Sequence, residues 1–177
     1  VRNKITSNID QADGLVSKIP NTSICIFSAD CAPILLADEK EKVIGAAHAG
    51  WRGALNGVIK NVVNEMIYMG AKRENIVAVV GPCISQEHYE VQYDFFKTFL
   101  NENSQNDSFF LKNRSGKIFF DLPNYVLKKL QIETLKKTLW TGQCTYSDEK
   151  RFYSFRRASH SREELTERLV SIISLEL

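Results

Sequence analysis

The sequence predicts a single domain of mixed α/β class, and three observations support this. Its 177 residues are enough to bury one core, and 44% hydrophobic with 25% charged residues is ordinary for a soluble globular protein. Short apolar runs typical of strands alternate with segments of helical periodicity. Polar turns join neighbouring strands into hairpins, which argues against a purely parallel sheet. No repeat, low-complexity tract or linker divides residues 1–177.

A central hairpin organises the rest of the prediction. Residues 33–38 and 43–48 are two apolar strands, and the charged residues 39–42 form the loop between them. A four-residue loop places Pro33 opposite His48. Because register decides which face every side chain occupies, a shift of one residue would turn these side chains to the other face.

Cys31 lies two residues before Pro33 and therefore shares a face with His48 by strand alternation. Diagonal neighbours of this kind are roughly 7–8 Å apart at the backbone. A thiolate and an imidazole at this spacing suit a zinc or copper ion. The same pair suits a nucleophile and its base, with Asp30 or another acid orienting the histidine. A buried thiol beside a core histidine is the third interpretation, and the residues alone leave all three open.

The remaining elements follow from periodicity and turn residues. A helix beginning at residue 52 or 53 and ending at residue 69 has apolar side chains at helical spacing, and Gly70 ends it. Asp121 caps a helix over residues 122–130. A further helix is predicted over residues 87–100. The other strands are predicted at residues 24–27, 76–80, 109–112, 117–120, 135–141, 152–155 and 169–175.

Residues 50–53, Gly-Trp-Arg-Gly, stand where a strand passes into a helix. Free N–H groups in a first helical turn, glycines that let a ligand approach the backbone, and the Arg52 side chain together suit a phosphate or carboxylate. Trp51 suits stacking on a planar base. The alternative is that Trp51 packs in the core and Arg52 is a solvated cap.

Further side chains have two interpretations each. Cys83 follows a buried strand, where α/β proteins often place ligand contacts, and it either lines a pocket or is an inert buried thiol. His88 is expected to be a surface or capping histidine, and His160 to be exposed. The basic and aromatic residues 151–157 are predicted to form a strand whose rings pack and whose arginines reach solvent or a pocket rim.

Composition limits which binding partners and which cellular compartment we expect for the protein. A net charge of +2 gives no electrostatic reason to expect nucleic acid or a membrane surface, and no apolar run reaches the roughly 20 residues of a membrane helix. The four cysteines are scattered without a CxxC motif, which indicates free thiols and a cytoplasmic location. The chain starts at Val1 without a visible signal peptide, and we expect it to continue upstream.

Four blocks, SADCAPILLAD, AAHAGWRG, GPCISQEHYEV and CTYSDEKRFYSFRR, closely resemble the YfiH-type family. Its members are described as multicopper polyphenol oxidases, laccase-like, and as zinc-dependent purine nucleoside phosphorylases. The resemblance implies a mixed-sheet α/β sandwich and makes Cys31 and His48 metal ligands, for zinc or alternatively copper. A further family ligand is a histidine upstream of the Ala-Asp-Gly turn. Residues 1–11 contain no histidine, so we expect the metal site to need a preceding segment.

The resemblance implies phosphorolysis of adenosine, inosine, guanosine or methylthioadenosine, and deamination of adenosine. The partners are then a purine nucleoside and phosphate, with Arg52 and Cys83 as candidate catalytic residues. Laccase chemistry through several coppers needs more than the three histidines present. The Cys31 and His48 pair is also compatible with a metal-free cysteine hydrolase or deamidase, and an incomplete site with a non-enzymatic binding module. The block 144–148 matches the family's pattern, but its residues do not indicate what it does.

Overall fold

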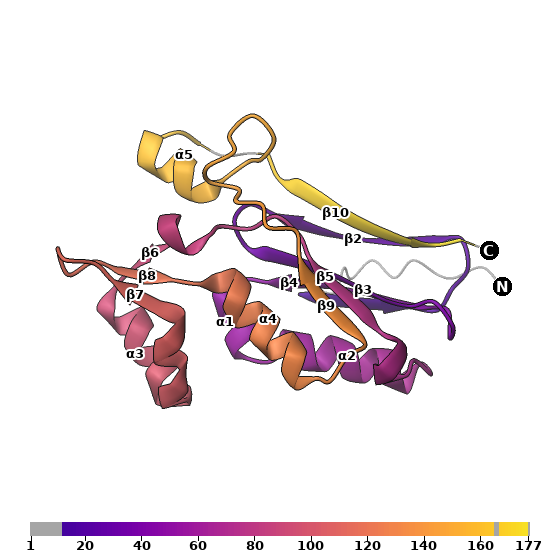
Figure 1. The fold of residues 1–177 in the computed structure, drawn as a ribbon. Helices are drawn as coiled ribbons and strands as arrows, with labels where there is room; N and C mark the ends of the chain where they lie inside the picture. Colours follow the sequence, from indigo (N-terminus) through magenta and orange to yellow (C-terminus); the bar gives the residue numbers. More distant parts are fainter. Residues whose placement is uncertain (1–11, 165–166, 177) are drawn as a thin grey trace.

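The computed structural model describes residues 12–164 and 167–176 (Figure 1). Its centre is a five-stranded sheet with the order β1-β4-β3-β5-β9. Neighbouring strands are antiparallel except for β5 and β9, which are parallel. The sheet is therefore mixed, as the predicted hairpin requires. The strands are β1 (Gly14–Ser17), β3 (Ala32–Asp38), β4 (Val43–Ala49), β5 (Val77–Val80) and β9 (Lys137–Trp140).

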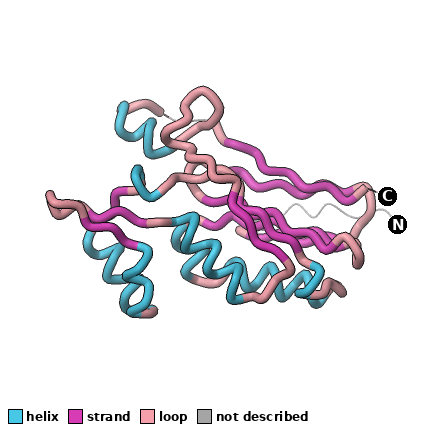
Figure 2. The backbone as a smooth tube through the Cα atoms, viewed as in Figure 1, coloured by secondary structure: helices cyan, strands magenta, loops and turns pink. Residues whose placement is uncertain are grey.

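Two layers cover the central sheet. A two-stranded sheet of β2 (Thr22–Ser28) and β10 (Leu169–Leu175) lies over one face, and the helices α1 (Trp51–Leu55), α2 (Val58–Tyr68) and α4 (Leu122–Ile132) lie against the other (Figures 1 and 2). This arrangement confirms the predicted α/β sandwich. The apolar faces of α2 and α4 pack on the sheet and bury, among others, Val63, Met66, Tyr125 and Leu130.

A smaller layer stands beside this sandwich. It consists of the three-stranded sheet β6-β8-β7, with β6 (Glu90–Val91), β7 (Phe110–Lys112) and β8 (Ile118–Phe120), and of α3 (Tyr93–Glu102). A cluster of aromatic rings fills the space between them, including Phe95, Phe99 and Phe120. The helix α5 (Phe155–Ser161) and the loop before it lie on the side of β2 and β10 in Figure 1.

The predicted register of the central hairpin is confirmed. Asp38 pairs with Val43, and Pro33 pairs with His48. The loop is held by Asp38, which is 1% exposed and whose carboxylate accepts hydrogen bonds from the backbone N–H groups of Lys40, Glu41 and Lys72. One buried carboxylate thus ties the hairpin turn to the segment that follows α2.

Three predicted elements were wrong in extent or type. The long helix expected to end at residue 69 is two helices, because Gly57 takes the left-handed conformation with φ of 90° between α1 and α2. The helix expected over residues 87–100 begins at Tyr93, and the residues before it form a 3₁₀ turn and β6. The strand expected at residues 152–155 is absent from the described structure. Ser154 instead caps α5 by accepting a hydrogen bond from Arg157 N.

The other predicted strands are present within two residues of their expected ends, and Asp121 caps α4 by accepting from Asn124 N. Gly70 follows α2 with φ of 106°, as expected of a glycine that ends a helix. Among the described residues, none of the helices combines the length and apolar character that crossing a membrane requires.

Candidate functional site

Cys31 and His48 meet at the end of the central hairpin. Cys31 precedes β3, His48 lies in β4, and both line a cavity of about 240 Å³ that we call the cysteine–histidine cavity. A methyl group built on Gly50 would lie 3.0 Å from Cys31 Sγ and 3.9 Å from His48 Cε1, so both atoms lie within 4 Å of one point. The other residues of this cavity are Asp13, Trp51, Arg52 and Gly53.

Asp13 holds the His48 ring. Its carboxylate Oδ1 lies 3.0 Å from His48 Nδ1, and its carbonyl accepts a hydrogen bond from His48 N at 2.7 Å. A histidine that ligates a metal through one ring nitrogen commonly donates from the other to a carboxylate in this way. The carboxylate beside His48 is therefore Asp13 and not Asp30, the acid named in the nucleophile interpretation. The sequence signal for Asp13 was its place in the Ala-Asp-Gly turn.

Asp30 instead fixes the backbone next to Cys31. It is 8% exposed and takes a positive φ of 87°, an uncommon conformation for a residue with a side chain. Its Oδ1 accepts from Thr145 Oγ1 at 2.6 Å, and its Oδ2 accepts from Arg156 N at 2.7 Å. The block 144–148 thus has a structural role, because Thr145 anchors the residue that precedes Cys31.

The Cys31 thiol is protonated at neutral pH in the absence of a cation. Burial, and then the negative charges of Asp30 and Asp13, raise its pKa to about 11. A nucleophilic cysteine needs the opposite, since only the thiolate attacks. A metal ion reverses this balance because it binds the thiolate and releases the proton. The electrostatics of the site therefore favour a metal ligand over a metal-free nucleophile.

The donor atoms suit zinc or copper, but the described chain supplies two of them. A catalytic zinc usually has three protein ligands and one open position. Among residues 12–164 and 167–176, no group of three or more histidine, cysteine, aspartate or glutamate side chains could hold a metal ion. The expected further histidine belongs before the Ala-Asp-Gly turn, and residues 1–11 lie outside the described residues.

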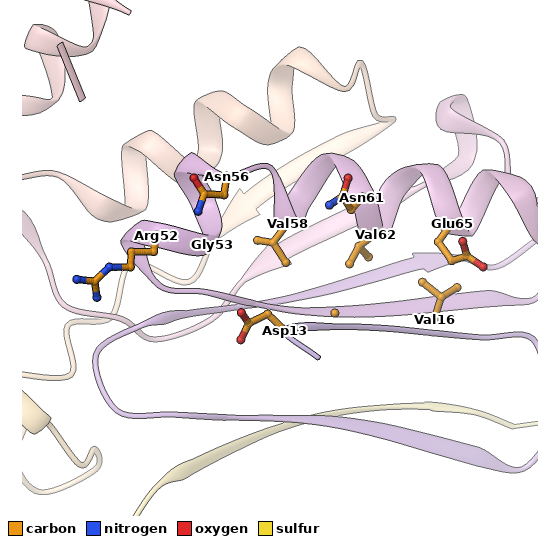
Figure 3. Close-up of a pocket in the computed structure, with 10 residues that line it drawn as sticks. Asp13, Val16, Arg52, Gly53, Asn56, Val58, Asn61, Val62 and Glu65 are labelled. Carbon is orange, nitrogen blue, oxygen red and sulfur yellow. The ribbon is translucent and has the colours of Figure 1, made fainter. Parts of the chain in front are cut away.

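Arg52 lies beside this pair. Its guanidinium carbon is 4.3 Å from the centre of the Trp51 ring, and its side chain lines both the cysteine–histidine cavity and a neighbouring groove of about 540 Å³. Figure 3 shows Arg52 and Asp13 at the same end of this groove, which runs between β1 and the helices α1 and α2. Because α1 has five residues, it lacks the dipole of a long helix, and Arg52 is the positively charged side chain at this end of the groove.

Trp51 packs in the core and also lines a cavity, and stacking of its ring on a base stays a prediction. Its ring packs against the core with centroids 4.7 Å from Phe95 and 6.1 Å from Phe99. It also lines a third hollow of about 480 Å³, which we call the aromatic cavity and which Tyr89 and Phe95 line as well. Its polar lining residues are Glu90 and Gln92, at and just after β6, and Arg156, Ser159 and His160 of α5. Sequence reasoning missed Tyr89, whose ring lies 5.3 Å below the Arg156 guanidinium carbon.

Cys83 is fully buried, and this burial raises the pKa of its thiol. It pairs through a single parallel β-bridge with Cys144, whose Sγ accepts a hydrogen bond from Ser85 Oγ at 3.1 Å. This position favours the inert-thiol interpretation of Cys83 over the catalytic one.

The remaining predicted side chains are structural or lie at the rim. His88 stacks on Tyr146 with ring centroids 4.5 Å apart, and the Tyr146 hydroxyl lies 3.0 Å from His160 Nδ1. Arg157 is half-buried, and contrary to expectation it does not line a described pocket. Its guanidinium donates to three backbone carbonyls, those of Thr145, Tyr146 and Phe152.

The fold and the site define a class: a mixed α/β sandwich with a cysteine–histidine pair at the end of its central hairpin. Residues 1–176 match the family described as "Multi-copper polyphenol oxidoreductase laccase". The chain belongs to this family, whose YfiH-type members its sequence motifs resemble.

Named relatives agree with this assignment. The chain is 39% identical over 166 residues to "Purine nucleoside phosphorylase RP494" of Rickettsia prowazekii, covering 93% of this chain and 68% of the relative. It is 28% identical to "Purine nucleoside phosphorylase YfiH" of Escherichia coli, covering 93% and 64%. The crystal structure of Neisseria meningitidis protein NMB0706 superimposes with a TM-score of 0.82 at 30% identity, covering 93% and 65%. The chain thus spans about two thirds of the length of these relatives.

Proposed function

We propose that this protein is a metal-dependent purine nucleoside phosphorylase. Its substrates are adenosine, inosine, guanosine and methylthioadenosine with phosphate, and it also deaminates adenosine. The observation that carries the proposal is the convergence of Cys31 Sγ and the His48 ring on one point beside Gly50, with Asp13 holding the far side of that ring. The names of the relatives, purine nucleoside phosphorylase, support the same activity.

Each part of the site has a role in this proposal. Cys31 and His48 hold the metal, zinc or alternatively copper, and when bound it supplies a Lewis acid or an activated water. Asp13 keeps a proton on His48 Nδ1 and so leaves Nε2 for the metal. Arg52 binds phosphate through its guanidinium, which matches the geometry of that anion. The aromatic cavity, which shares Trp51 with the cysteine–histidine cavity, takes the base.

The proposal is tested by two cysteine variants of the protein expressed from its natural start codon. Cys31→Ser removes the thiolate, and we expect it to lose both bound zinc and phosphate-dependent release of base from inosine. Cys25→Ser is the matched control, because Cys25 lies in β2 of the outer sheet and should affect neither. Zinc is measured by elemental analysis and the released base by chromatography.

The outcomes separate the candidate functions. Zinc-free wild-type protein that releases base without phosphate would favour the cysteine hydrolase over the metal-dependent phosphorylase. Bound zinc without turnover of any nucleoside would favour the binding module. For the 177-residue chain alone we expect weak zinc binding, because two ligands hold a divalent ion less well than three.

A further inference from the structure

Cys83 and Cys144 lie opposite each other on two segments that are far apart in the chain. They pair directly through a parallel β-bridge, in which Cys83 N donates to the carbonyl of Gln143 at 3.3 Å and Thr145 N donates to the carbonyl of Cys83 at 3.1 Å. Backbones paired in this way lie about 4.7–4.9 Å apart, within the roughly 4.4–6.8 Å that separates the Cα atoms of disulfide-bonded cysteines. Residues paired directly also stand on the same face of the ladder. The backbone therefore permits a bond between the two sulfur atoms.

Cys144 has the features of a reactive thiol. It is partly exposed, and its Sγ accepts hydrogen bonds from Ser85 Oγ at 3.1 Å and from Ser85 N at 3.4 Å. Burial raises the pKa of the Cys144 thiol, but the hydrogen bonds from Ser85 and from Ser147 outweigh burial and lower this pKa overall. An oxidant reacts with a thiolate that it can reach from solvent. Cys144 meets both of these requirements.

Cys83 has the complementary features of a resolving thiol, one that reacts with an oxidised neighbour and not with the oxidant itself. It is fully buried, so a reagent in solution does not reach its sulfur. Burial, and then the negative charge of Cys144, raise the pKa of the Cys83 thiol. Cys83 therefore stays protonated and does not compete with Cys144 for an oxidant. A thiol that is inert toward solvent in this way still reacts with a group that forms beside it.

Hydrogen bonds to Asp30 hold the two cysteine segments together. Ile84, the residue after Cys83, donates from its N–H to the carbonyl of Asp30 at 3.0 Å. Thr145, the residue after Cys144, donates from its hydroxyl to Asp30 Oδ1 at 2.6 Å. Because one buried residue fixes both segments, the two cysteines are already positioned before any bond forms between them. Such positioning favours reaction within the pair over reaction with a group from solution.

We infer that Cys144 is a site of reversible oxidation by hydroperoxides and that Cys83 is its resolving thiol. The Cys144 thiolate attacks one oxygen of hydrogen peroxide and the O–O bond breaks. The sulfur becomes a sulfenic acid, and the other oxygen leaves as hydroxide, which takes up the proton that the Cys144 thiol released and forms water. The Cys83 sulfur then attacks the Cys144 sulfur, the S–O bond breaks, and the hydroxyl group leaves with the Cys83 proton as a second water. Two thiols are thus oxidised to a disulfide while one peroxide is reduced to water, and this reaction does not rest on the proposed function.

The test treats the reduced protein, expressed from its natural start codon, with equimolar hydrogen peroxide and maps disulfides by peptide mass spectrometry. We expect a disulfide between Cys83 and Cys144 that dithiothreitol reduces. In Cys83→Ala the sulfenic acid of Cys144 has no resolving thiol and should be trapped by dimedone. Ser85→Ala removes a hydrogen bond to the thiolate and should slow oxidation of Cys144 about tenfold. The matched control is Cys25→Ser, because Cys25 is a partly exposed cysteine of the outer sheet, and this variant should form the same disulfide at the wild-type rate.

Peroxide-treated wild-type protein that keeps Cys83 and Cys144 as free thiols would overturn the inference. So would a disulfide that joins Cys144 to Cys25 or Cys31, because the β-bridge would then not decide the partner. Oxidation of wild-type Cys144 to the sulfinic acid would show that Cys83 does not capture the intermediate. Dimedone labelling of Cys83 in Cys144→Ser would reverse the two roles. An unchanged oxidation rate in folded Ser85→Ala would contradict the part given to the Ser85 hydroxyl, and the melting temperature of each reduced variant shows that it is folded.

Discussion

Gly50→Ala is a direct test of the site, because the added methyl group would enter the space beside its two proposed ligands, Cys31 and His48. Gly50 has φ of −66° and ψ of 165°, a conformation that alanine adopts without strain. The methyl would lie 3.0 Å from Cys31 Sγ, closer than the roughly 3.5–4.0 Å of an ordinary nonbonded contact. The Cys31 side chain must therefore move by a few tenths of an ångström or more.

We expect Gly50→Ala to lower the stability of the fold only slightly and to lower zinc affinity strongly. Overpacking of this kind costs about 1–3 kcal/mol, and the lower entropy of the unfolded alanine chain returns about 0.4–1 kcal/mol. We expect the melting temperature to fall by about 2–4 °C per kcal/mol of the difference. Changes to the groups that orient a metal ligand typically reduce metal affinity about 10- to 100-fold. We expect a loss of this size in zinc affinity when the new methyl group displaces the Cys31 side chain.

The assay is zinc titration against a chromogenic chelator, with the melting temperature measured in parallel. Gly53→Ala is the matched control, because its methyl would meet His48 O at 3.3 Å and Val58 Cγ1 at 3.5 Å and would not approach Cys31. We expect that variant to retain its zinc. Unchanged zinc affinity in Gly50→Ala, with a folded protein, would refute the assignment of Cys31 and His48 as a pair that shares one ion.

Two further predictions concern Arg52 and Asp38. Arg52→Ala should raise the KM for phosphate about 10-fold or more, because the variant loses a charged hydrogen-bond donor to phosphate. Bound zinc should stay constant, because arginine is not a zinc ligand. Loss of zinc would contradict this division of roles. Burial raises the pKa of Asp38, but its backbone hydrogen bonds from Lys72, Glu41 and Lys40 outweigh burial and lower it overall. A lowered pKa stabilises the fold above the unfolded value of about 3.9, and this contribution is lost on acidification. Asp38→Asn should therefore cost about 2 kcal/mol in urea unfolding at pH 7 and much less at pH 3, and a cost independent of pH would contradict the argument.

The central hairpin was predictable from sequence because local rules determine it. Strand alternation and a four-residue loop fix the pairing of Pro33 with His48, and the structure has that pairing. At Gly57, by contrast, the apolar periodicity continues without a break and predicts one helix. The positive φ of Gly57 depends on how α1 and α2 each pack against the sheet, which helical periodicity does not encode.

The α5 helix and the carboxylates of the site were harder to predict for the same reason. The aromatic residues around Ser154 favour a strand by propensity, but the Ser154 cap and the contacts of Arg157 with carbonyls of the preceding loop stabilise a helix. Asp13 and Asp30 are both acids near the site, and sequence does not say which one faces His48. That choice depends on β1 pairing with β4, a contact between segments far apart in the chain.

The bonds of Asp30 have a consequence for the order in which the protein is made. Its partners Thr145 and Arg156 follow it by 115 and 126 residues, so a nascent chain on the ribosome lacks them until most of it has been synthesised. Closing a loop of this length costs only about 0.6 kcal/mol more than closing a loop of half the length. The delay before the Asp30 hydrogen bonds form is therefore set by translation more than by loop-closure entropy. Cys31 and His48 are already adjacent in the early hairpin, but the backbone next to Cys31 is held in its strained conformation only after α5 has emerged. The cysteine–histidine pair therefore acquires its final geometry late in synthesis.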